Sequence, residues 1–122
     1  PRSPETMSDA TCLFCRIASR AVPADIVAEA DGLLAFTDSN PQAPTHLLII
    51  PTEHIPTLAD ASESHTLLLG RAVHFANRLA RERRLTEHGY RLVVNCGAAA
   101  GQSVWHLHWH LLGGRPMTWP PG

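Results

Sequence analysis

The chain contains no lysine, and all ten of its positively charged side chains are arginines. No Schiff base can therefore form on a lysine, and no phosphate-binding loop of the Gly-Lys-Ser/Thr type exists. If the protein binds a phosphate group, the donors must be backbone amides, histidines, hydroxyl groups or arginines.

Long apolar segments and an excess of charge of either sign are also absent. No stretch of the sequence approaches the 18 consecutive apolar residues that a transmembrane helix needs, and the formal net charge is only −1. We therefore expect neither a membrane nor a nucleic acid as a partner. Three cysteines are an odd number, which argues against a secreted disulfide framework and favours a cytoplasmic protein with reduced thiols.

The length of the chain and its apolar pattern predict one α+β domain over residues 1–122 with an antiparallel sheet. We expect residues 1–7 to be disordered or to derive from an expression tag, with Met7 as the native start. Apolar runs predict five strands. Two are expected within residues 25–38, on either side of the Asp31-Gly32 turn, and one each at 46–51, 90–96 and 103–112.

Two helices are expected beside these strands. A short helix is predicted within residues 11–24, before Pro23, and one long helix over residues 62–84 with Ser62 as its N-cap. The long helix follows from an apolar stripe that recurs every three or four residues, at Leu68, Ala72, Phe75 and Leu79.

The segment VWHLHWHLLGG, residues 104–114, places His106, His108 and His110 at every second position. Side chains alternate between the two faces of a strand, so these imidazoles should share one face, roughly 6–7 Å apart. The other face would contribute to the core through Trp105, Leu107, Trp109 and Leu111. A polar solvent-facing surface, or a metal-binding patch on it, is the alternative interpretation of the same pattern.

The segment CLFC, residues 12–15, is a second candidate site. A C-x-x-C pair can be a redox dithiol, half of a zinc site or a coincidence. The redox interpretation is weakened because no βαβ unit accompanies the pair, and a structural zinc site would need two further ligands. Cys96 has no partner motif and is expected to be a buried thiol.

Several blocks of the sequence together resemble one family. HLHWHLL at 106–112 matches a His-x-His-x-His-x-x motif with apolar x, and the accompanying blocks are PQAPTHLLIIP (41–51), YRLVVNCG (90–97), GQSVWHLHWHLLGG (101–114) and WPPG (119–122). The chain therefore resembles the histidine triad (HIT) superfamily, and within it the Hint branch of purine nucleoside phosphoramidases. The resemblance implies a HIT-like fold in which two five-stranded sheets join across a homodimer, with residues 113–122 as a C-terminal tail.

The resemblance also implies a reaction, the hydrolysis of the phosphorus–nitrogen bond in AMP-amine or AMP-lysine phosphoramidates. His108 corresponds to the nucleophile that forms a nucleotidyl-histidine intermediate, with its near ring nitrogen held by the carbonyl of His106. His110 corresponds to the residue that contacts the phosphate and protonates the leaving group, and Ser103 to a further catalytic donor.

Purine nucleotides such as AMP, GMP or their phosphoramidates are the implied ligands. The residues expected to bind them are Asp38, Ser39, Asn95, Gly101, Gln102, Ser103, His108 and His110, with Asp38 accepting hydrogen bonds from the ribose hydroxyls. The base is expected to lie among Phe14, Ile17, Val22, Phe36 and Leu48. Trp119 matches a tryptophan that approaches the partner subunit's active site in the dimer.

Some bacterial relatives pair a C-x-x-C with two histidines, and the resemblance implies the same structural zinc site here. Its four ligands would be Cys12, Cys15, His54 and His106. No organic cofactor is expected.

Two other functions stay open at this point. One is hydrolysis of diadenosine polyphosphates, as in the Fhit branch of the family. The other is a nucleotide-binding dimer without enzymatic activity that regulates other proteins. A uridylyltransferase is disfavoured, since those relatives carry Gln where this chain has His110. The role of His46 is left undecided.

Overall fold

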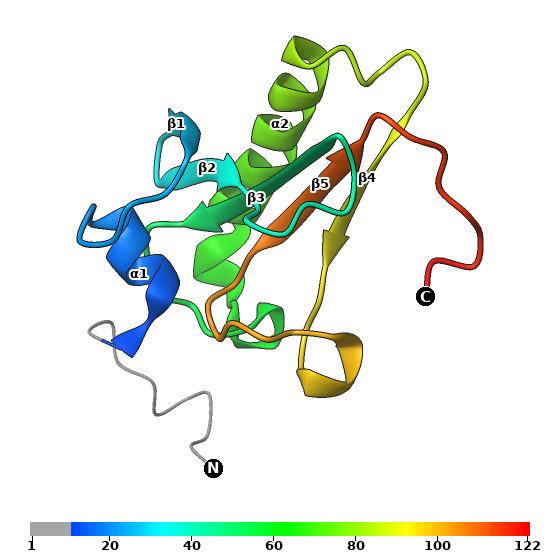
Figure 1. Ribbon diagram of the computed structural model, residues 1–122. Helices are drawn as coiled ribbons and strands as arrows, with labels where there is room; N and C mark the ends of the chain where they lie inside the picture. Colours follow the sequence, from blue (N-terminus) through cyan, green and yellow to red (C-terminus); the bar gives the residue numbers. More distant parts are fainter. Residues whose placement is uncertain (1–10) are drawn as a thin grey trace.

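The computed structural model describes residues 11–122 and consists of a five-stranded antiparallel sheet with two α-helices (Figure 1). The expectations for residues 1–7 lie outside the described range. The strands are β1 (Ile26–Ala30), β2 (Leu33–Thr37), β3 (Thr45–Pro51), β4 (Tyr90–Val94) and β5 (Trp109–Gly113). They lie in the order β1-β2-β3-β5-β4, so β5 is inserted between β3 and β4. The predicted α+β class is confirmed.

The first two strands form the predicted hairpin. Asp31 and Gly32 connect β1 to β2, and Gly32 adopts a positive φ of 75° that a turn of this kind requires. β2 then continues to β3 through residues 38–44, where Asp38 N donates a hydrogen bond to the His46 carbonyl. This pairing brings Asp38 and His46 to the same end of the sheet.

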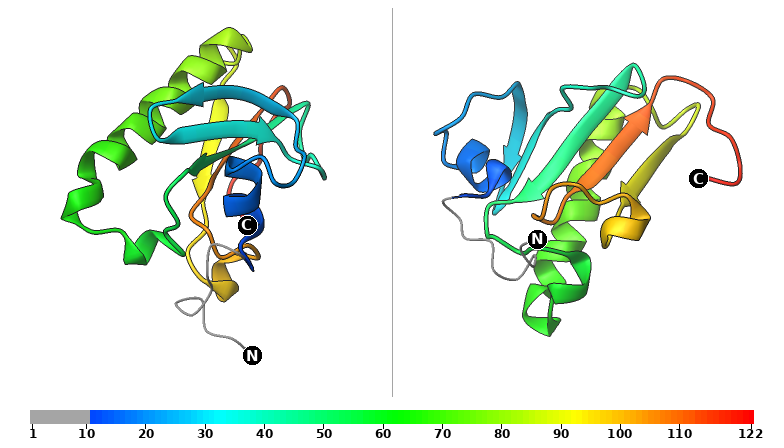
Figure 2. Two further views of the ribbon diagram at one scale, coloured as in Figure 1. Left: turned by 90° about the vertical axis from the view of Figure 1, so that its left-hand side faces the viewer. Right: turned by 60° about the horizontal axis from the view of Figure 1, so that its bottom comes forward.

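The two helices cover opposite faces of the sheet (Figures 1 and 2). Helix α2 (Thr66–Glu82) buries its predicted stripe, including Leu68 and Phe75, against one face. Helix α1 (Leu13–Ala18) lies on the other face and buries Phe14 and Ile17. The long helix is shorter than predicted, because residues 63–65 form a separate 3-10 turn that Ser62 precedes.

Alternation along β2 and β3 divides the core into two clusters. Leu33, Ala35, Leu47 and Ile49 face α2, whereas Leu34, Phe36, Leu48 and Ile50 face α1. These side chains are almost completely buried. The apolar cluster on the α1 side contains no residue of β4, so α1 leaves that part of the sheet face uncovered.

The prediction of a strand over residues 103–112 is wrong at its beginning. Regular pairing starts only at Trp109, which lies opposite Ile49 of β3 and Val94 of β4. Residues 104–106 form a bend instead, and the amide of Leu107 donates to the carbonyl of Ile55, outside the sheet. The chain therefore approaches the sheet at an angle before β5 begins.

This bend changes where the alternating residues point. Leu107, Trp109 and Leu111 belong to the core as predicted, but Trp105 is only half-buried and belongs to neither core cluster. The three histidines do not form one regular row on a strand face. Among residues 11–122, no helix is both long and apolar enough to cross a membrane.

Candidate functional site

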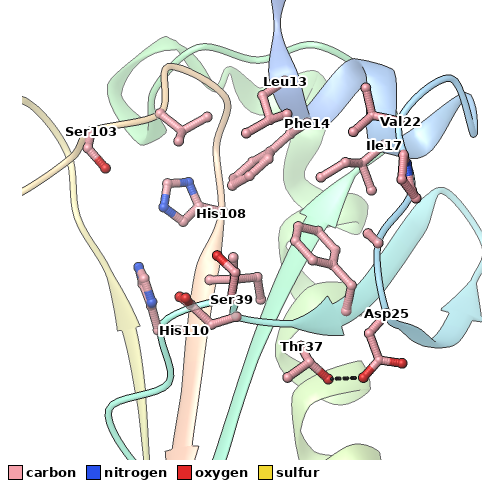
Figure 3. A pocket seen from close by; sticks show the side chains of 16 residues that line it. Leu13, Phe14, Ile17, Val22, Asp25, Thr37, Ser39, Ser103, His108 and His110 are labelled. Atoms are coloured by element: carbon pink, nitrogen blue, oxygen red, sulfur yellow. Dashed lines mark hydrogen bonds between the residues drawn. The ribbon is translucent and has the colours of Figure 1, made fainter.

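A pocket of about 540 Å³ opens on the α1 side of the sheet. Figure 3 shows His108 and His110 pointing into it from one side, opposite the apolar side chains of Ile17 and Val22. A volume of several hundred Å³ is typical of small-molecule sites. All five residues predicted to surround a base line this pocket, and so do Asp38, Ser39 and Ser103.

The ring of His108 is oriented by the backbone two residues before it. Its Nδ1 lies 2.7 Å from the carbonyl oxygen of His106. A carbonyl can only accept, so Nδ1 carries the proton and donates it, as the family resemblance implied. The Phe14 ring makes an edge contact with the His108 ring at 5.1 Å. Neutral His108 therefore has an unprotonated Nε2.

His46 and His110 form a second oriented pair. The backbone amide of Gln42 donates to Nδ1 of His46 at 3.0 Å, so neutral His46 must carry its proton on Nε2. That nitrogen lies 2.9 Å from Nδ1 of His110 and 3.3 Å from Oδ2 of Asp38. When His46 donates to His110, the proton of neutral His110 is left on its own Nε2. The sequence left His46 undecided, and only these contacts reveal its part in the site.

Burial keeps these three histidines neutral. Desolvation lowers the pKa of His108, against the raising effect of its hydrogen bond to the His106 carbonyl. Burial also lowers the pKa of His46, partly offset by Asp38. For His110, desolvation followed by the charges of His108 and His46 lowers the pKa to about 4. Perturbed histidines gathered at one pocket are typical of a functional site.

The predicted zinc ligands converge on one point beneath α1. Nδ1 of His106 lies 3.2 Å from Sγ of Cys12 and 3.4 Å from Sγ of Cys15. Nδ1 of His54 lies 3.3 Å from Cys15 Sγ and 3.3 Å from His106 Nδ1. Ligands about 2.0–2.3 Å from a tetrahedral Zn²⁺ are separated by roughly 3.3–3.8 Å. The two thiols and two imidazoles therefore fit zinc.

Asp38, His46 and His110 also bring three possible ligand atoms within 4.8 Å of one another, yet their chemistry is different. Nε2 of His106 lies 2.8 Å from the Pro51 carbonyl, which holds its proton there and leaves the converging Nδ1 as a lone pair. The Gln42 amide acts in the opposite direction, since it keeps a proton on the converging Nε2 of His46. The first cluster is thus suited to a metal and the second to donating protons.

Three of the predicted nucleotide-binding residues do not line the pocket: Asn95, Gly101 and Gln102. Gln102 is buried, and its carboxamide accepts from the amide of Gly97 and donates to the carbonyls of Pro56 and Val104. Its side chain therefore shapes the loop before Ser103, which corrects the expectation that it offers donors to a phosphate. Asn95 lies near this loop, since a Cβ added to Gly101, which has a φ of 100°, would be 3.9 Å from Nδ2 of Asn95.

One further expectation, that Cys96 is a buried thiol, is tested by exposure. Cys96 is exposed and not buried, because it follows the end of β4, where the chain leaves the sheet. Trp119 is 82% exposed and lies beneath the guanidinium of Arg91. Sequence reasoning also missed Thr37 and Asp25, which are hydrogen-bonded to each other at the pocket wall. Nothing in their sequence context distinguished them from ordinary polar residues near strand ends.

The sequence is similar to one family of known proteins. The family model described as "HIT domain" matches residues 19–117. The purine nucleoside phosphoramidase of Escherichia coli strain K12 is 48% identical over 105 residues, which cover 86% of this chain and 88% of that protein. The 14 kDa zinc-binding protein of Zea mays is 46% identical over 118 residues, covering 95% of this chain and 91% of that protein.

A solved structure is similar in both sequence and fold. The crystal structure of a HIT family hydrolase from Legionella pneumophila Philadelphia 1 has a TM-score of 0.90 and 53% sequence identity, and covers 92% of this chain and 100% of that chain. The family model begins after α1, so the Cys12–Cys15 pair lies outside its match.

The lowered pKa of His110 predicts a pH-dependent stability. Its pKa is about 4 in the folded protein, against about 6.5 in the unfolded chain. Between these values the unfolded state binds the extra proton, so the free energy of unfolding should fall as the pH drops from about 6.5 to 4. Urea denaturation in that range should give a shallower pH dependence for His110→Asn than for the parent protein.

His88→Asn provides the matched control for the substitution itself, because it removes an exposed imidazole that does not line the pocket. Equal slopes for His110→Asn and the parent protein would show that burial of His110 does not disfavour its charged form.

Proposed function

The chain belongs to the HIT domain family, and from this we propose that it is a purine nucleoside phosphoramidase. In this proposal it hydrolyses the phosphorus–nitrogen bond of AMP-amine or AMP-lysine phosphoramidates. The similarity to the phosphoramidase of Escherichia coli supports the reaction class. The proposed chemistry needs a nucleophile, a proton for the leaving amine and a binding surface for the nucleoside.

The observation that carries the proposal is the orientation of His108. Its Nδ1 is bound to the His106 carbonyl and its pKa is lowered by burial, so Nε2 is an unprotonated nucleophile. We expect Nε2 to attack the phosphorus while the bond to nitrogen breaks, which yields a nucleotidyl-histidine. Water then attacks the same phosphorus and releases AMP. Two inversions would give net retention of configuration.

His110 and Ser103 are placed to assist the leaving group and the phosphoryl oxygens. Both line the pocket, and the His110 ring lies 5.1 Å from the His108 ring between centroids. His110 is neutral at pH 7 in the free protein, given its pKa of about 4. The neutral ring has one proton to give to the leaving amine, and donation from His46 places that proton on Nε2. The water that later attacks the nucleotidyl group would return a proton to the ring.

The remaining pocket residues suit a nucleoside. Asp38 is only partly exposed, and its Oδ1 accepts the Asn40 amide at 2.8 Å, so its carboxylate is held at the pocket wall to accept from ribose hydroxyls. Ser39 lies beside it. The apolar wall of Phe14, Ile17, Val22, Phe36 and Leu48 offers the surface against which a purine would pack.

A comparison of substrates tests the function. The protein should hydrolyse adenosine 5′-phosphoramidate faster than diadenosine polyphosphates. His108→Ala should lower kcat by about three orders of magnitude or more while AMP binding changes only a few-fold, because a nucleophile acts mainly in the transition state. Single-turnover kinetics and calorimetric titration with AMP measure the two effects.

Mass spectrometry after a quench at neutral pH should locate the nucleotidyl group on His108, since phosphoramidate bonds are acid-labile. A label on His110, or near-native turnover by His108→Ala, would overturn the assignment. Faster hydrolysis of diadenosine polyphosphates would instead favour the Fhit-like activity, and AMP binding without any turnover would favour a regulatory binding protein.

We propose in addition that Cys12, Cys15, His54 and His106 hold a structural Zn²⁺. The converging donor atoms and the similarity to the zinc-binding protein of Zea mays support this. A zinc ion there would stabilise the fold by joining α1 to the segments that carry His54 and His106. The proton on Nε2 of His46 argues that only this one of the two clusters binds zinc.

Elemental analysis of protein purified without added metal should therefore find about one zinc per chain. Cys12→Ala should lower the free energy of unfolding by about 2 kcal/mol or more and change kcat far less, because the metal contributes folding energy. The exposed thiol of Cys96 supplies the control, since Cys96→Ala should alter neither quantity. Absence of zinc, with Cys12 and Cys15 freely titratable in the folded protein, would rule the site out.

We also propose that the chain forms a homodimer with two equivalent sites. β4 is an edge strand with one partner, and such an edge is prone to pair with another chain. Large apolar side chains are exposed nearby and on α2, namely Trp119, Leu67 and Val73. Both features support an interface that continues the sheet from β4 into a second copy.

Analytical ultracentrifugation at micromolar concentration should give about twice the 13.3 kDa mass of one chain. Deletion of residues 117–122 should change substrate preference more than the melting temperature, if Trp119 reaches the neighbouring site. A monomer throughout the micromolar range would contradict the dimer.

A further inference from the structure

A chain of hydrogen bonds connects the C-terminal tail to the proposed leaving-group side of the pocket. Nε of Arg115 donates to the Gln42 carbonyl at 2.8 Å, and the Gln42 amide donates to Nδ1 of His46 at 3.0 Å. His46 Nε2 then lies 2.9 Å from Nδ1 of His110. Arg115 itself is exposed and does not line the pocket, so it would act only through these intermediates.

We propose that Arg115 is a positioning residue for proton delivery by His110. By holding the peptide groups of Gln42, it keeps the proton of His46 on Nε2 and thereby keeps the proton of neutral His110 on its own Nε2. That nitrogen is the one free to face a leaving amine. The proposal rests on the phosphoramidase function for its kinetic consequence, but the positions of the protons can be tested without it.

The loop that carries Gln42 is held from two sides. Gly114, next to Arg115, adopts a φ of 93°, and a Cβ there would lie only 2.9 Å from Cβ of Pro44. Within the loop, Nε2 of Gln42 donates to the Asn40 carbonyl, and the Asn40 amide donates to Oδ1 of Asp38. The position of the loop thus affects both polar partners of His46, the Gln42 amide and the Asp38 carboxylate.

Gln42 is exposed, so packing alone does not determine the direction of its amide. The net free energy of one hydrogen bond is enough to change the ratio of two imidazole tautomers several-fold. Without the Arg115 contact, the Gln42 amide can turn away from His46, and Nδ1 of His46 then becomes able to hold the proton. In that form His46 cannot donate to His110, and the tautomer of His110 is no longer selected.

Long-range ¹H–¹⁵N NMR on ¹⁵N-histidine-labelled protein measures these tautomers directly. The parent protein should have both His46 and His110 protonated on Nε2. Arg115→Ala should give a measurable Nδ1-protonated fraction of His46, and Arg115→Lys, which keeps a charged donor, should restore most of the parent state. Arg91→Ala is the matched control, because Arg91 contacts the tail at Thr118 and Trp119 but not the loop.

Kinetics with two leaving groups provide a second readout. Arg115→Ala should lower kcat about tenfold for an AMP-alkylamine, whose leaving group needs a proton, with KM within about twofold. For the 4-nitrophenyl ester of AMP, whose leaving group needs none, kcat should stay within about twofold. A general loss of structure would lower both rates equally.

Unchanged tautomers of His46 and His110 in Arg115→Ala would overturn the proposal, and so would equal rate losses for the two substrates or a tautomer change in Arg91→Ala as large as that in Arg115→Ala. If the parent protein hydrolyses neither substrate, the proposed function fails while the NMR comparison still decides whether Arg115 controls His46.

Discussion

The hydrogen bond from Nδ1 of His108 to the carbonyl of His106 is the interaction on which the site depends. It selects the tautomer in which Nε2 of His108 faces the pocket as a lone pair. The same His106 directs its ring into the Cys12–Cys15 cluster and donates Nε2–H to the Pro51 carbonyl. His106 therefore contacts the end of β3 and the Cys12–Cys15 cluster through its side chain, and orients the nucleophile through its backbone carbonyl.

The Cys12–Cys15 cluster and the Asp38–His46–His110 cluster differ in chemistry because a different backbone group binds one histidine of each, at the ring nitrogen that faces away from the cluster. The Pro51 carbonyl accepts from Nε2 of His106, so Nδ1, which faces the cysteines, has a lone pair that suits a metal ion. The Gln42 amide donates to Nδ1 of His46, so Nε2 carries the proton and can donate it to His110. The residue types alone, two histidines with acidic or thiol partners, do not distinguish a metal site from a proton-donating site. The backbone group that binds each imidazole makes this distinction.

The position of the pocket follows from incomplete coverage of the sheet. Helix α2 spans one face and closes it with apolar side chains. Helix α1 has only six residues and covers mainly β2 and β3 on the other face. His108 and His110 lie at the edge of the sheet area that α1 covers. Buried apolar side chains line the pocket on one side of them, and partly exposed polar groups line it on the other. Partial burial lowers the pKa of the histidines while leaving them accessible to a ligand.

The sequence by itself determined the α+β class, the hairpin at Asp31-Gly32, the buried stripe of α2 and the family motif around His106, His108 and His110, because local periodicity and turn chemistry carry that information. Only the tertiary structure decided where β5 begins, since strand pairing depends on β3 and β4. It also decided that Gln102 supports a loop, that Cys96 is exposed and that His46 orients His110. Strand pairing, the bond from Gln102 to the Pro56 carbonyl and the contact between His46 and His110 all join segments far apart in the chain, which no local pattern of residues encodes.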